Sequence, residues 1–319
     1  AYMINIDSEK DKVLTVSCAG SIRAFFRFPL QCEPFEGTAL TISVDGLQGG
    51  HSGEEIHLGR ANANVLLGRL LYEISCVTDL RIVEIKGGTK ENAIPRVAGA
   101  MVLVADEQKA LQIAAEKTAE IKKEFYSTDK DIQICVTAEG VGNEPAFDRS
   151  LTERLTCFLF CAPNGVQVMS ADVPGLVQTS LNIGRIYQEE DAVVCSAMLR
   201  SSVNSQNQEV LAKLQALCKA LGATVRVESA YSAWEYRAAS PLRETMITAF
   251  RNVYGEEPKI EALHAGLECG ILSGKMPHLD CISIGPDLPN IHTPRERLYI
   301  QSTGRIWRLL METLKQLTE

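Results

Sequence analysis

Five histidines occur in this 319-residue sequence, and three of them lie in glycine-containing segments that could bring an imidazole to a metal or a substrate. His292 follows an apolar segment at 281–284 and a Gly-Pro turn. Loops at strand ends are where α/β proteins place ligands, and a neutral imidazole in such a loop can bind zinc. Spacing alone favours an ordinary surface-loop histidine, so the zinc ligand is a hypothesis.

Asp7 ends the first strand-like segment, residues 3–6, and is a second residue that could bind a metal. Carboxylates at strand ends serve as metal ligands or as caps of turns and helices, and capping is the more common role. Asp7 and His292 together are compatible with one metal site. Because a catalytic zinc usually has three protein ligands, these two residues do not suffice for one.

His51 lies within Gly-Gly-His-Ser-Gly, a glycine-flanked bend between a predicted strand and a predicted helix. Such a bend can direct an imidazole at a substrate oxygen, as the stabilisation of an oxyanion requires. The alternative is a turn histidine that is hydrogen-bonded to the backbone. We expect the adjacent Glu54 and Glu55 to stabilise the N-terminus of the following helix through its dipole, rather than to form a catalytic pair.

Three further polar residues could hold a substrate. Asn92 and Arg200 lie beside predicted strands, and the paired donors of an arginine suit a carboxylate. A surface salt bridge is the alternative role for Arg200. His264 and Glu268 share the glycine-rich segment 263–270, in which an acid could bind a substrate ammonium group.

The order of predicted elements indicates two domains. Residues 1–20 contain two strand-like segments, and residues 232–319 contain a helix that starts at Ser240-Pro241 and another over 303–317. Both blocks are too small to bury a core alone. Residues 21–231 alternate between periods typical of strands and of helices. They predict one antiparallel sheet with helices on one face, inserted into a domain formed by the two outer blocks.

Composition limits the partners and the compartment. A formal net charge of −8 disfavours nucleic acid and anionic membranes as main partners. No apolar run reaches the ~20 residues that span a bilayer, and no signal peptide is visible. The ten cysteines form no Cys-x-x-Cys pair and lie in apolar stretches, so we expect buried, reduced thiols and a cytoplasmic protein. Residues 2–7 resemble a buried strand, which suggests that the chain has been cut.

Taken together, five segments resemble the aminoacylhistidine dipeptidases, which belong to the co-catalytic zinc peptidases together with carboxypeptidase G and acetylornithine deacetylase. The segments are Asn-Ile-Asp-Ser-Glu at 5–9, Gly-Gly-His-Ser-Gly-Glu-Glu-Ile-His-Leu-Gly-Arg-Ala-Asn-Ala-Asn at 49–64, Gly-Gly-Thr-Lys-Glu-Asn-Ala-Ile-Pro-Arg at 87–96, His-Ala-Gly-Leu-Glu-Cys-Gly at 264–270, and Gly-Pro with His-Thr-Pro-Arg-Glu within 285–296. The resemblance extends over essentially the whole chain.

The resemblance implies an α/β fold. It consists of a zinc-peptidase catalytic domain of the phosphorylase/hydrolase-like type, incomplete here, with an inserted α+β sandwich lid. Residues 1–20 and 232–319 then belong to the catalytic domain, and residues 21–231 form the lid, through which a homodimer is expected. In this family two zinc ions, for which manganese or cobalt can substitute, share a bridging aspartate. A separate glutamate activates the bridging water.

The resemblance also implies a role for each candidate residue. Asp7 matches the carboxylate ligand of one zinc and His292 the histidine ligand of the other. His51 matches a lid histidine that polarises the scissile carbonyl and that the partner subunit supplies in many relatives. Asn92 and Arg200 match residues that hold the substrate, Arg200 by its C-terminal carboxylate. Glu268 lies where it could contact the free amino group of the substrate.

One departure from the family pattern concerns the metal site. The His-x-Asp motif and the Glu-Glu pair of the family precede the strand with which this sequence starts, and the sequence does not contain them at that position. We therefore expect metal-assisted hydrolysis of dipeptides, of the Xaa-His type, from the intact protein but not from this chain alone. Two alternatives stay open: a non-catalytic dimerisation or peptide-binding module, and a related peptidase or deacylase with another substrate.

Overall fold

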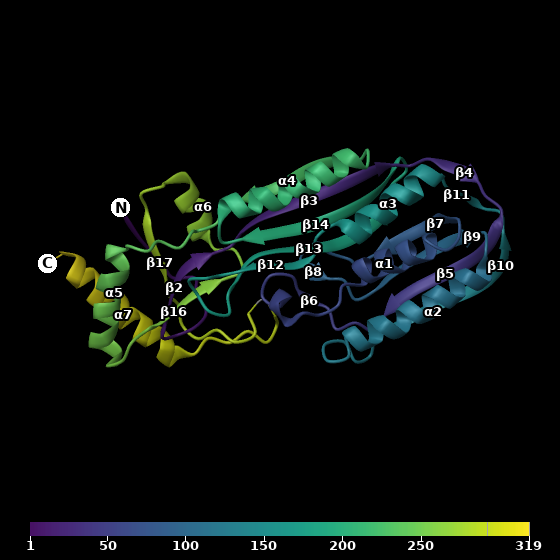
Figure 1. Ribbon diagram of the computed structural model, residues 1–319. Coiled ribbons are helices and arrows are strands. Elements are labelled where there is room, and N and C mark those ends of the chain that lie inside the picture. The colour runs from purple at the N-terminus through teal and green to yellow at the C-terminus, as the bar shows by residue number, and fades with distance from the viewer. Residues whose placement is uncertain (292, 319) are drawn as a thin grey trace.

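The computed structural model describes residues 1–291 and 293–318, and within them the chain forms a large and a small unit side by side (Figure 1). The large unit contains a nine-stranded sheet in the order β10-β5-β9-β7-β13-β14-β3-β15, with β12 beside β13. All of its neighbouring strands are antiparallel. The strands are β3 (Gly20–Pro29), β5 (Gly37–Asp45), β7 (Leu80–Gly87), β9 (Ala98–Val104), β10 (Gln133–Gly142), β12 (Gly165–Met169), β13 (Val177–Gln188), β14 (Ala192–Ser201) and β15 (Thr224–Tyr231).

Four helices cover one face of this sheet (Figure 1): α1 (Ala63–Ser75), α2 (Glu107–Glu124), α3 (Arg149–Cys161) and α4 (Asn204–Ala220). Their apolar sides and alternate residues of the strands form one continuous buried core. The side chains of Asn62, Asp106 and Asp148 accept backbone N–H groups at the starts of α1, α2 and α3, which fixes where these helices begin. The predicted antiparallel sheet with helices on one face is confirmed.

The small unit has a four-stranded sheet in the order β1-β17-β2-β16. Its strands are β1 (Tyr2–Asn5), β2 (Val13–Cys18), β16 (Lys259–Leu263) and β17 (Asp280–Ser283), and its helices are α5 (Pro241–Tyr254), α6 (Glu268–Lys275) and α7 (Ile300–Thr318). Residues of β2, β17, α5 and α7 form a second core, and both ends of the chain lie in this unit (Figure 1). Ser240 caps α5 with Pro241 in its first turn, as predicted.

The chain passes between the two units at two adjacent points. Cys18, which ends β2, forms an antiparallel bridge with Trp234, which follows β15. Two residues after Cys18, a Cβ on Gly20 would lie only 2.4 Å from the backbone nitrogen of Ala233. The two connections can therefore pack this closely only because residue 20 is a glycine. The domain limits after residues 20 and 231 stay a prediction.

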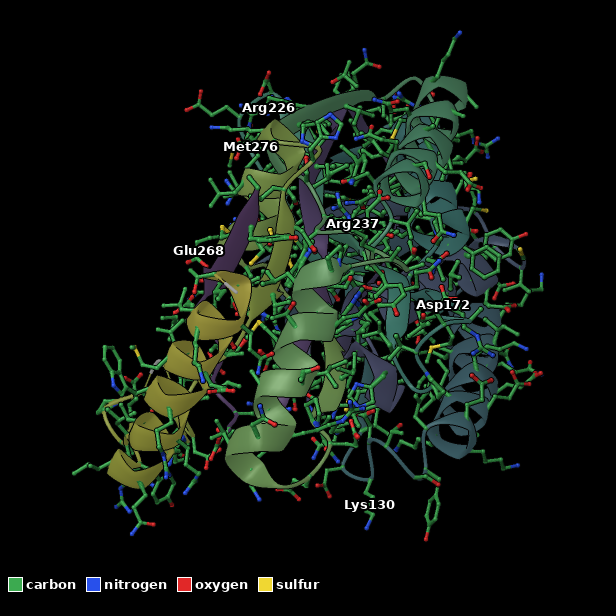
Figure 2. The ribbon with its side chains drawn as sticks, turned by 90° about the vertical axis from the view of Figure 1, so that its left-hand side faces the viewer. Lys130, Asp172, Arg226, Arg237, Glu268 and Met276 are labelled. Atoms are coloured by element: carbon green, nitrogen blue, oxygen red, sulfur yellow. The ribbon has the colours of Figure 1, made fainter. Side chains whose placement is uncertain are left out.

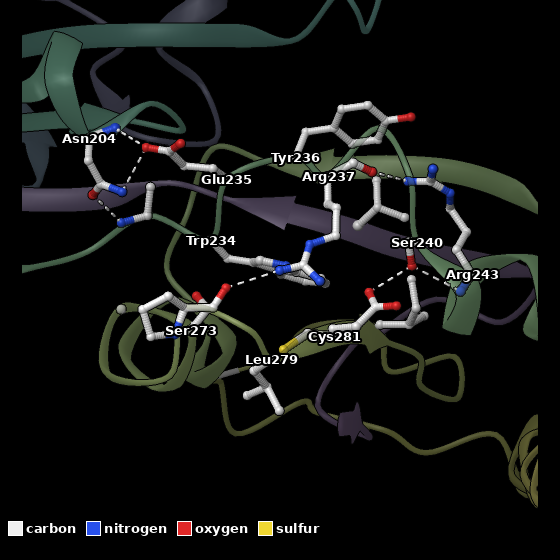
Figure 3. Close-up of a pocket in the computed structure, with 16 residues that line it drawn as sticks. Asn204, Trp234, Glu235, Tyr236, Arg237, Ser240, Arg243, Ser273, Leu279 and Cys281 are labelled. Atoms are coloured by element: carbon white, nitrogen blue, oxygen red, sulfur yellow. Dashed lines mark hydrogen bonds between the residues drawn. The ribbon is translucent and has the colours of Figure 1, made fainter. Parts of the chain in front are cut away.

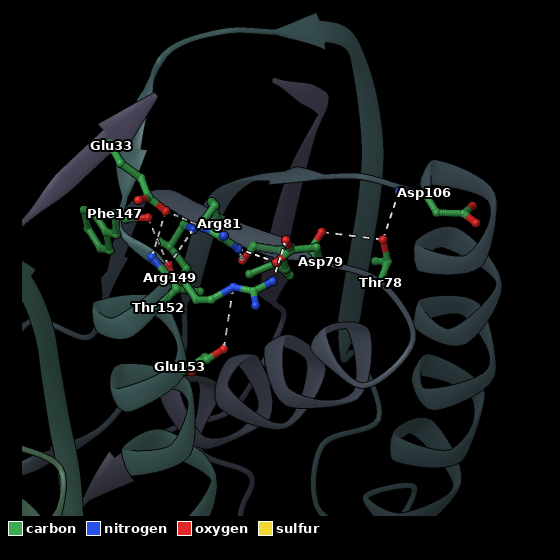
Figure 4. Close-up of polar contacts among 11 residues, drawn as sticks. Glu33, Thr78, Asp79, Arg81, Asp106, Phe147, Arg149, Thr152 and Glu153 are labelled. Carbon is green, nitrogen blue, oxygen red and sulfur yellow. Dashed lines mark hydrogen bonds and ion pairs between the residues drawn. The ribbon is translucent and has the colours of Figure 1, made fainter. Parts of the chain in front are cut away.

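A buried arginine forms a cluster of ion pairs at one end of the large unit (Figure 4). Arg81 on β7 is only 6% exposed, and it forms ion pairs with Glu33, at 3.1 Å, and with Asp79. Glu33 belongs to β4 (Cys32–Pro34), which pairs with β11 (Pro145–Phe147), and Asp79 also accepts from Arg149 at 2.8 Å. Each charge in this cluster therefore has an opposite charge beside it, which is the condition for burying a guanidinium at low cost.

Two expectations from the sequence are wrong, and one strand was not predicted. The unpredicted strand is the ten-residue β3, which lies inside the large sheet. Residues 2–5 form an edge strand rather than a buried one, with Tyr2 52% exposed, because β1 has only β17 as a neighbour among the described strands. The ten cysteines are free as expected, but four are exposed: Cys32, Cys76, Cys135 and Cys161. Cys135, for instance, lies on the edge strand β10.

Candidate functional site

The loop that carries His51 is held by a carboxylate and by glycine geometry. Gly49 and Gly50 have φ values of +64° and +140°, which residues with a Cβ rarely adopt, and they lead into the short strand β6 (Gly50–His51). Oε2 of Glu55 accepts the backbone N–H of His51 at 2.7 Å, and the same carboxylate pairs with Arg60 at 3.0 Å. These contacts lower the pKa of Glu55, first through the N–H of His51.

This arrangement corrects the expected role of the Glu54-Glu55 pair. The helix that follows is only the three-residue 3₁₀ helix η1 (Ile56–Leu58), and no side chain caps it. Glu55 therefore stabilises the bend around His51 rather than a helix dipole. Behind the loop, the fully buried Asp129 accepts backbone N–H groups of Gln48 and Ala61, both at 2.8 Å, so both ends of the loop are fixed.

The hydrogen bonds of His51 determine its tautomer. Nδ1 accepts the backbone N–H of Gly53 at 3.3 Å and that of Glu54 at 3.1 Å. An acceptor nitrogen carries no proton, so the proton of the neutral ring is on Nε2, which can donate. Burial and then the positive charge of Arg200 lower the pKa of His51, and both keep the ring neutral. His51 is thus built as a neutral donor through Nε2–H.

Arg200 differs from Arg81 in having no counter-charge. It lies on β14, is 5% exposed, and its side chain forms neither an ion pair nor a hydrogen bond with any residue that the structure describes; its Nε is buried. A buried, uncompensated guanidinium is costly, whereas one that meets an anion is not. The site is therefore suited to an anionic ligand group, and a carboxylate matches the paired donors of arginine.

Gly53 is the point at which three groups of the site meet. A Cβ on this residue would lie 2.6 Å from the carbonyl oxygen of His264, 3.1 Å from Cε1 of His51 and 3.2 Å from Nε of Arg200. Two of these residues belong to the large unit and His264 belongs to the small unit. The structure thus brings His51 and Arg200 of the same chain together, and only glycine leaves room between them.

The segment that carries Asn92 is pressed onto the sheet face opposite the helices. The side-chain amide of Asn182 donates to the carbonyl oxygens of Glu91 and Ala93, both at 2.9 Å, and the Glu91 carboxylate accepts from Ser196 at 3.1 Å. A Cβ on Gly184 would lie 2.5 Å from Cα of Glu91, so the close approach requires glycine.

Asn92 itself is placed beside His51. Its carbonyl oxygen accepts the backbone N–H of Ser52 at 2.9 Å, and the next residue, Ala93, pairs with His51 between β8 (Ala93–Ile94) and β6. The side chain of Asn92 is exposed. It therefore stands next to the imidazole that the sequence singled out, with its amide accessible to a ligand.

His264, for which no role was predicted from the sequence, is central to the site. It follows β16, is 8% exposed, and its Nε2 lies 2.7 Å from Oγ of Ser180 on β13. Burial and then the charge of Arg200 lower its pKa to about 3, so the imidazole is neutral at physiological pH. Its Nδ1 is buried and has no partner among the described residues.

Asp7 and Glu268 both lie in the small unit. Glu268 is the first residue of α6 and lies at the surface (Figure 2), where its Oε2 accepts from Nδ2 of Asn5 at 3.3 Å. Asp7 follows Asn5 by two positions and is also exposed. His292 lies outside the described residues, so its predicted place in a metal site stays a prediction.

The described side chains do not form a metal centre on their own. Among them, no group of three or more His, Cys, Asp or Glu residues is arranged to hold a metal ion. A catalytic zinc usually needs three protein ligands. The donor set of residues 1–291 and 293–318 therefore does not fit a catalytic metal without further ligands.

The charged residues that line a pocket of about 330 Å³ beside the connection between the units are hydrogen-bonded to other groups of the chain (Figure 3). Asp280 accepts from Ser240 at 2.7 Å and from the backbone of Leu242 at 3.1 Å. Glu235 accepts from Asn204 at 2.8 Å, and Arg237 donates to a backbone carbonyl. The polar groups of this pocket therefore belong to the structural connection between the two units.

Comparisons with known proteins agree on one kind of relative. A cytosol non-specific dipeptidase from Escherichia coli (strain K12) is 35% identical over 319 residues, which are 99% of this chain and 66% of that protein. The crystal structure of an aminoacylhistidine dipeptidase from Vibrio alginolyticus superposes with a TM-score of 0.90 at 33% identity, and covers 98% of this chain and 64% of the other. The chain thus spans slightly less than two thirds of both relatives.

A family model described as a peptidase dimerisation domain matches residues 42–130, which include His51 and Asn92. Within the described part of the chain, no helix is long and apolar enough to cross a membrane.

Proposed function

We propose that the chain is a member of the family of aminoacylhistidine and cytosol non-specific dipeptidases, to which it is similar, and that it forms the substrate-holding part of a metal-dependent dipeptidase. The observation that carries the proposal is the buried Arg200, which has no counter-charge among the described residues and stands beside the neutral donor His51. A dipeptide offers both a terminal carboxylate and a carbonyl within one small molecule. These are the two groups that this pair of side chains would bind.

In the proposed mechanism, Arg200 binds the C-terminal carboxylate and thereby fixes the position of the peptide bond. His51 donates its Nε2–H to the carbonyl oxygen of that bond, and the donation strengthens as negative charge develops on the oxygen. Because Nδ1 of His51 is held by two backbone N–H groups, the ring needs no reorientation to donate. Asn92 is proposed to bind the substrate from the neighbouring segment, and Glu268 its amino group.

The metal belongs to the proposal, because the described side chains alone do not form its site. Metal dependence is a general property of this family, and zinc, with manganese or cobalt as substitutes, is the proposed metal. Asp7 and His292 are proposed as outer ligands. The other ligands and the general base would come from residues that this chain does not contain, so we propose that the chain alone binds zinc weakly and does not hydrolyse dipeptides.

The preferred dipeptide and the assembly are finer proposals. One relative is named for aminoacylhistidine substrates and the other as non-specific, and we propose Xaa-His dipeptides as one accepted class. We also propose a homodimer through the large unit, supported by the match to the dimerisation-domain model, and a cytoplasmic location, supported by the name of the curated relative.

The test uses two proteins: this chain, and a longer form that adds the family's His-x-Asp and Glu-Glu segment. Each is incubated with zinc, manganese or cobalt and with β-alanyl-histidine, glycyl-histidine or glycyl-glycine, and free amino acids are measured. The longer form is expected to release amino acids and the chain alone is not. The proposal is wrong if the longer form hydrolyses no dipeptide with any of these metals.

A further inference from the structure

Ser180 and Arg200 are direct cross-strand partners in the antiparallel pair β13–β14. Side chains at such paired positions stand on the same face with Cβ atoms about 4.5–5.5 Å apart. His264 reaches this face from the small unit and places its Nε2 2.7 Å from Oγ of Ser180. The imidazole of His264 is therefore a neighbour of the guanidinium of Arg200, although the two residues come from different units.

Both neighbours have a buried nitrogen without a partner. Nε of Arg200 and Nδ1 of His264 are buried and form no hydrogen bond within the described part of the chain. Such atoms are rare in folded proteins and call for an explanation. If Nδ1 of His264 carried no proton, it could accept a hydrogen bond from the adjacent guanidinium of Arg200, but no such bond is present among the described residues. The missing bond is explained if Nδ1 is itself a donor. Two donors cannot satisfy each other, whereas an oxygen anion placed between them would satisfy both.

We propose that Arg200 Nε–H and His264 Nδ1–H bind one carboxylate, the C-terminal carboxylate of the substrate, and that Ser180 holds His264 in the required tautomer. The proposal rests on the proposed function and adds the second donor and its positioning residue. In it, the hydroxyl of Ser180 donates to Nε2, which leaves the ring proton on Nδ1. Because His264 belongs to the small unit, the carboxylate would also bridge the two units.

The first test measures KM and kcat of the longer form with glycyl-histidine for three variants. His264→Leu removes the donor and is expected to raise KM about tenfold, the effect of losing one hydrogen bond to a charged group, with kcat within about twofold. His264→Asn keeps an amide N–H near the position of Nδ1 and is expected to restore most of the affinity. Ser180→Ala is expected to lie between wild type and His264→Leu.

His278→Ala serves as the control, because His278 is exposed and lies outside the site. Thermal unfolding of each variant separates a folding defect from a binding defect. If His264→Leu is folded and leaves KM unchanged, or if His264→Asn is no better than His264→Leu, the second donor does not exist.

The second test needs no catalysis and uses the 319-residue chain. Its histidines are labelled with ¹⁵N, and the protein is titrated with glycyl-glycine or with glycyl-glycinamide, which lacks the carboxylate. Glycyl-glycine is expected to shift the Nδ1 resonance of His264 and the amide is not, with the response lost in Arg200→Met. Equal responses to both probes, or a deprotonated Nδ1, would overturn the inference even if the longer form is an active dipeptidase. A response to the carboxylate alone would support it even if no dipeptide is hydrolysed.

Discussion

The carboxylate of Glu55 and the backbone N–H of His51 form a 2.7 Å hydrogen bond that closes the bend of the imidazole loop. Arg60 stands on the other side of the same carboxylate, at 3.0 Å, and also donates to the carbonyl oxygen of Gly49. The loop is therefore closed by a charge-assisted contact, and such contacts are stronger than bonds between neutral groups. The direction of the His51 ring depends on a residue that touches no substrate.

Replacement of Glu55 by alanine should therefore lower kcat of the longer form by about tenfold, because the loss of one charge-assisted bond releases the bend. KM should change less, since Arg200 still binds the carboxylate. Steady-state kinetics with glycyl-histidine measure both parameters. Glu54→Ala is the matched control, because Glu54 is exposed and its side chain forms none of the described contacts of the loop. An equal loss in both variants would mean that the carboxylate of Glu55 has no special part.

Arg81 and Arg200 should respond to the same substitution in opposite ways. Arg81→Met removes the ion-pair partner of Glu33 and one of the two partners of Asp79, which keeps Arg149. A loss of about 2 kcal/mol in the free energy of unfolding is expected, since both carboxylates are partly exposed. Arg200→Met removes an uncompensated buried charge and should leave that free energy unchanged or raise it. Its KM for dipeptides should rise by about 30-fold or more. Urea unfolding measures the free energy of unfolding of both variants, and steady-state kinetics measure the KM of Arg200→Met. A destabilised Arg200→Met would show that Arg200 is structural.

Much of the fold could be predicted because its signals are local. The helices α2 and α5 begin at Asp106 and Ser240, whose side chains cap them, and both starts are readable within four residues. The same holds for the glycine bend at His51. Strand β3 has an equally local signal, since Ile22, Ala24, Phe26 and Phe28 recur at every second position, the period of a strand.

The rest of the site depends on contacts between distant parts of the chain. Ser180 and His264 are 84 residues apart, and the register of β13 against β14 decides that Ser180 stands beside Arg200. A shift of β13 by one residue would turn the side chain of Ser180 to the other face, away from Arg200. No local sequence pattern predicts the register of β13 against β14. The motif around His264 therefore singled out the segment, while its partner could be found only in three dimensions.

Gly53→Ala should weaken both the fold and the substrate site, because the added Cβ would lie 2.6 Å from the carbonyl oxygen of His264, a backbone atom that cannot move alone. We expect a loss of about 1–3 kcal/mol in the free energy of unfolding, as for overpacked cores, together with a higher KM. Gly304→Ala is the matched control. Gly304 lies inside α7 with no atom within 4 Å of the added Cβ, so alanine should stabilise the helix by about 0.5–1 kcal/mol.

The buried His264 should make the fold sensitive to mild acid. Its pKa is about 3 in the folded protein, against an ordinary value of 6.5, so between these values the unfolded chain binds one proton more than the folded chain. The free energy of unfolding must then fall as the pH falls through this window, by roughly 2 kcal/mol between about pH 7 and about pH 5. In His264→Asn this part of the slope should disappear, whereas exposed His278→Asn should keep it. Urea titrations of the three proteins at the two pH values measure the difference. Parallel slopes in wild type and His264→Asn would contradict this prediction, because they would show that His264 is already protonated in the folded protein. The neighbouring positive charge of Arg200 disfavours that protonation.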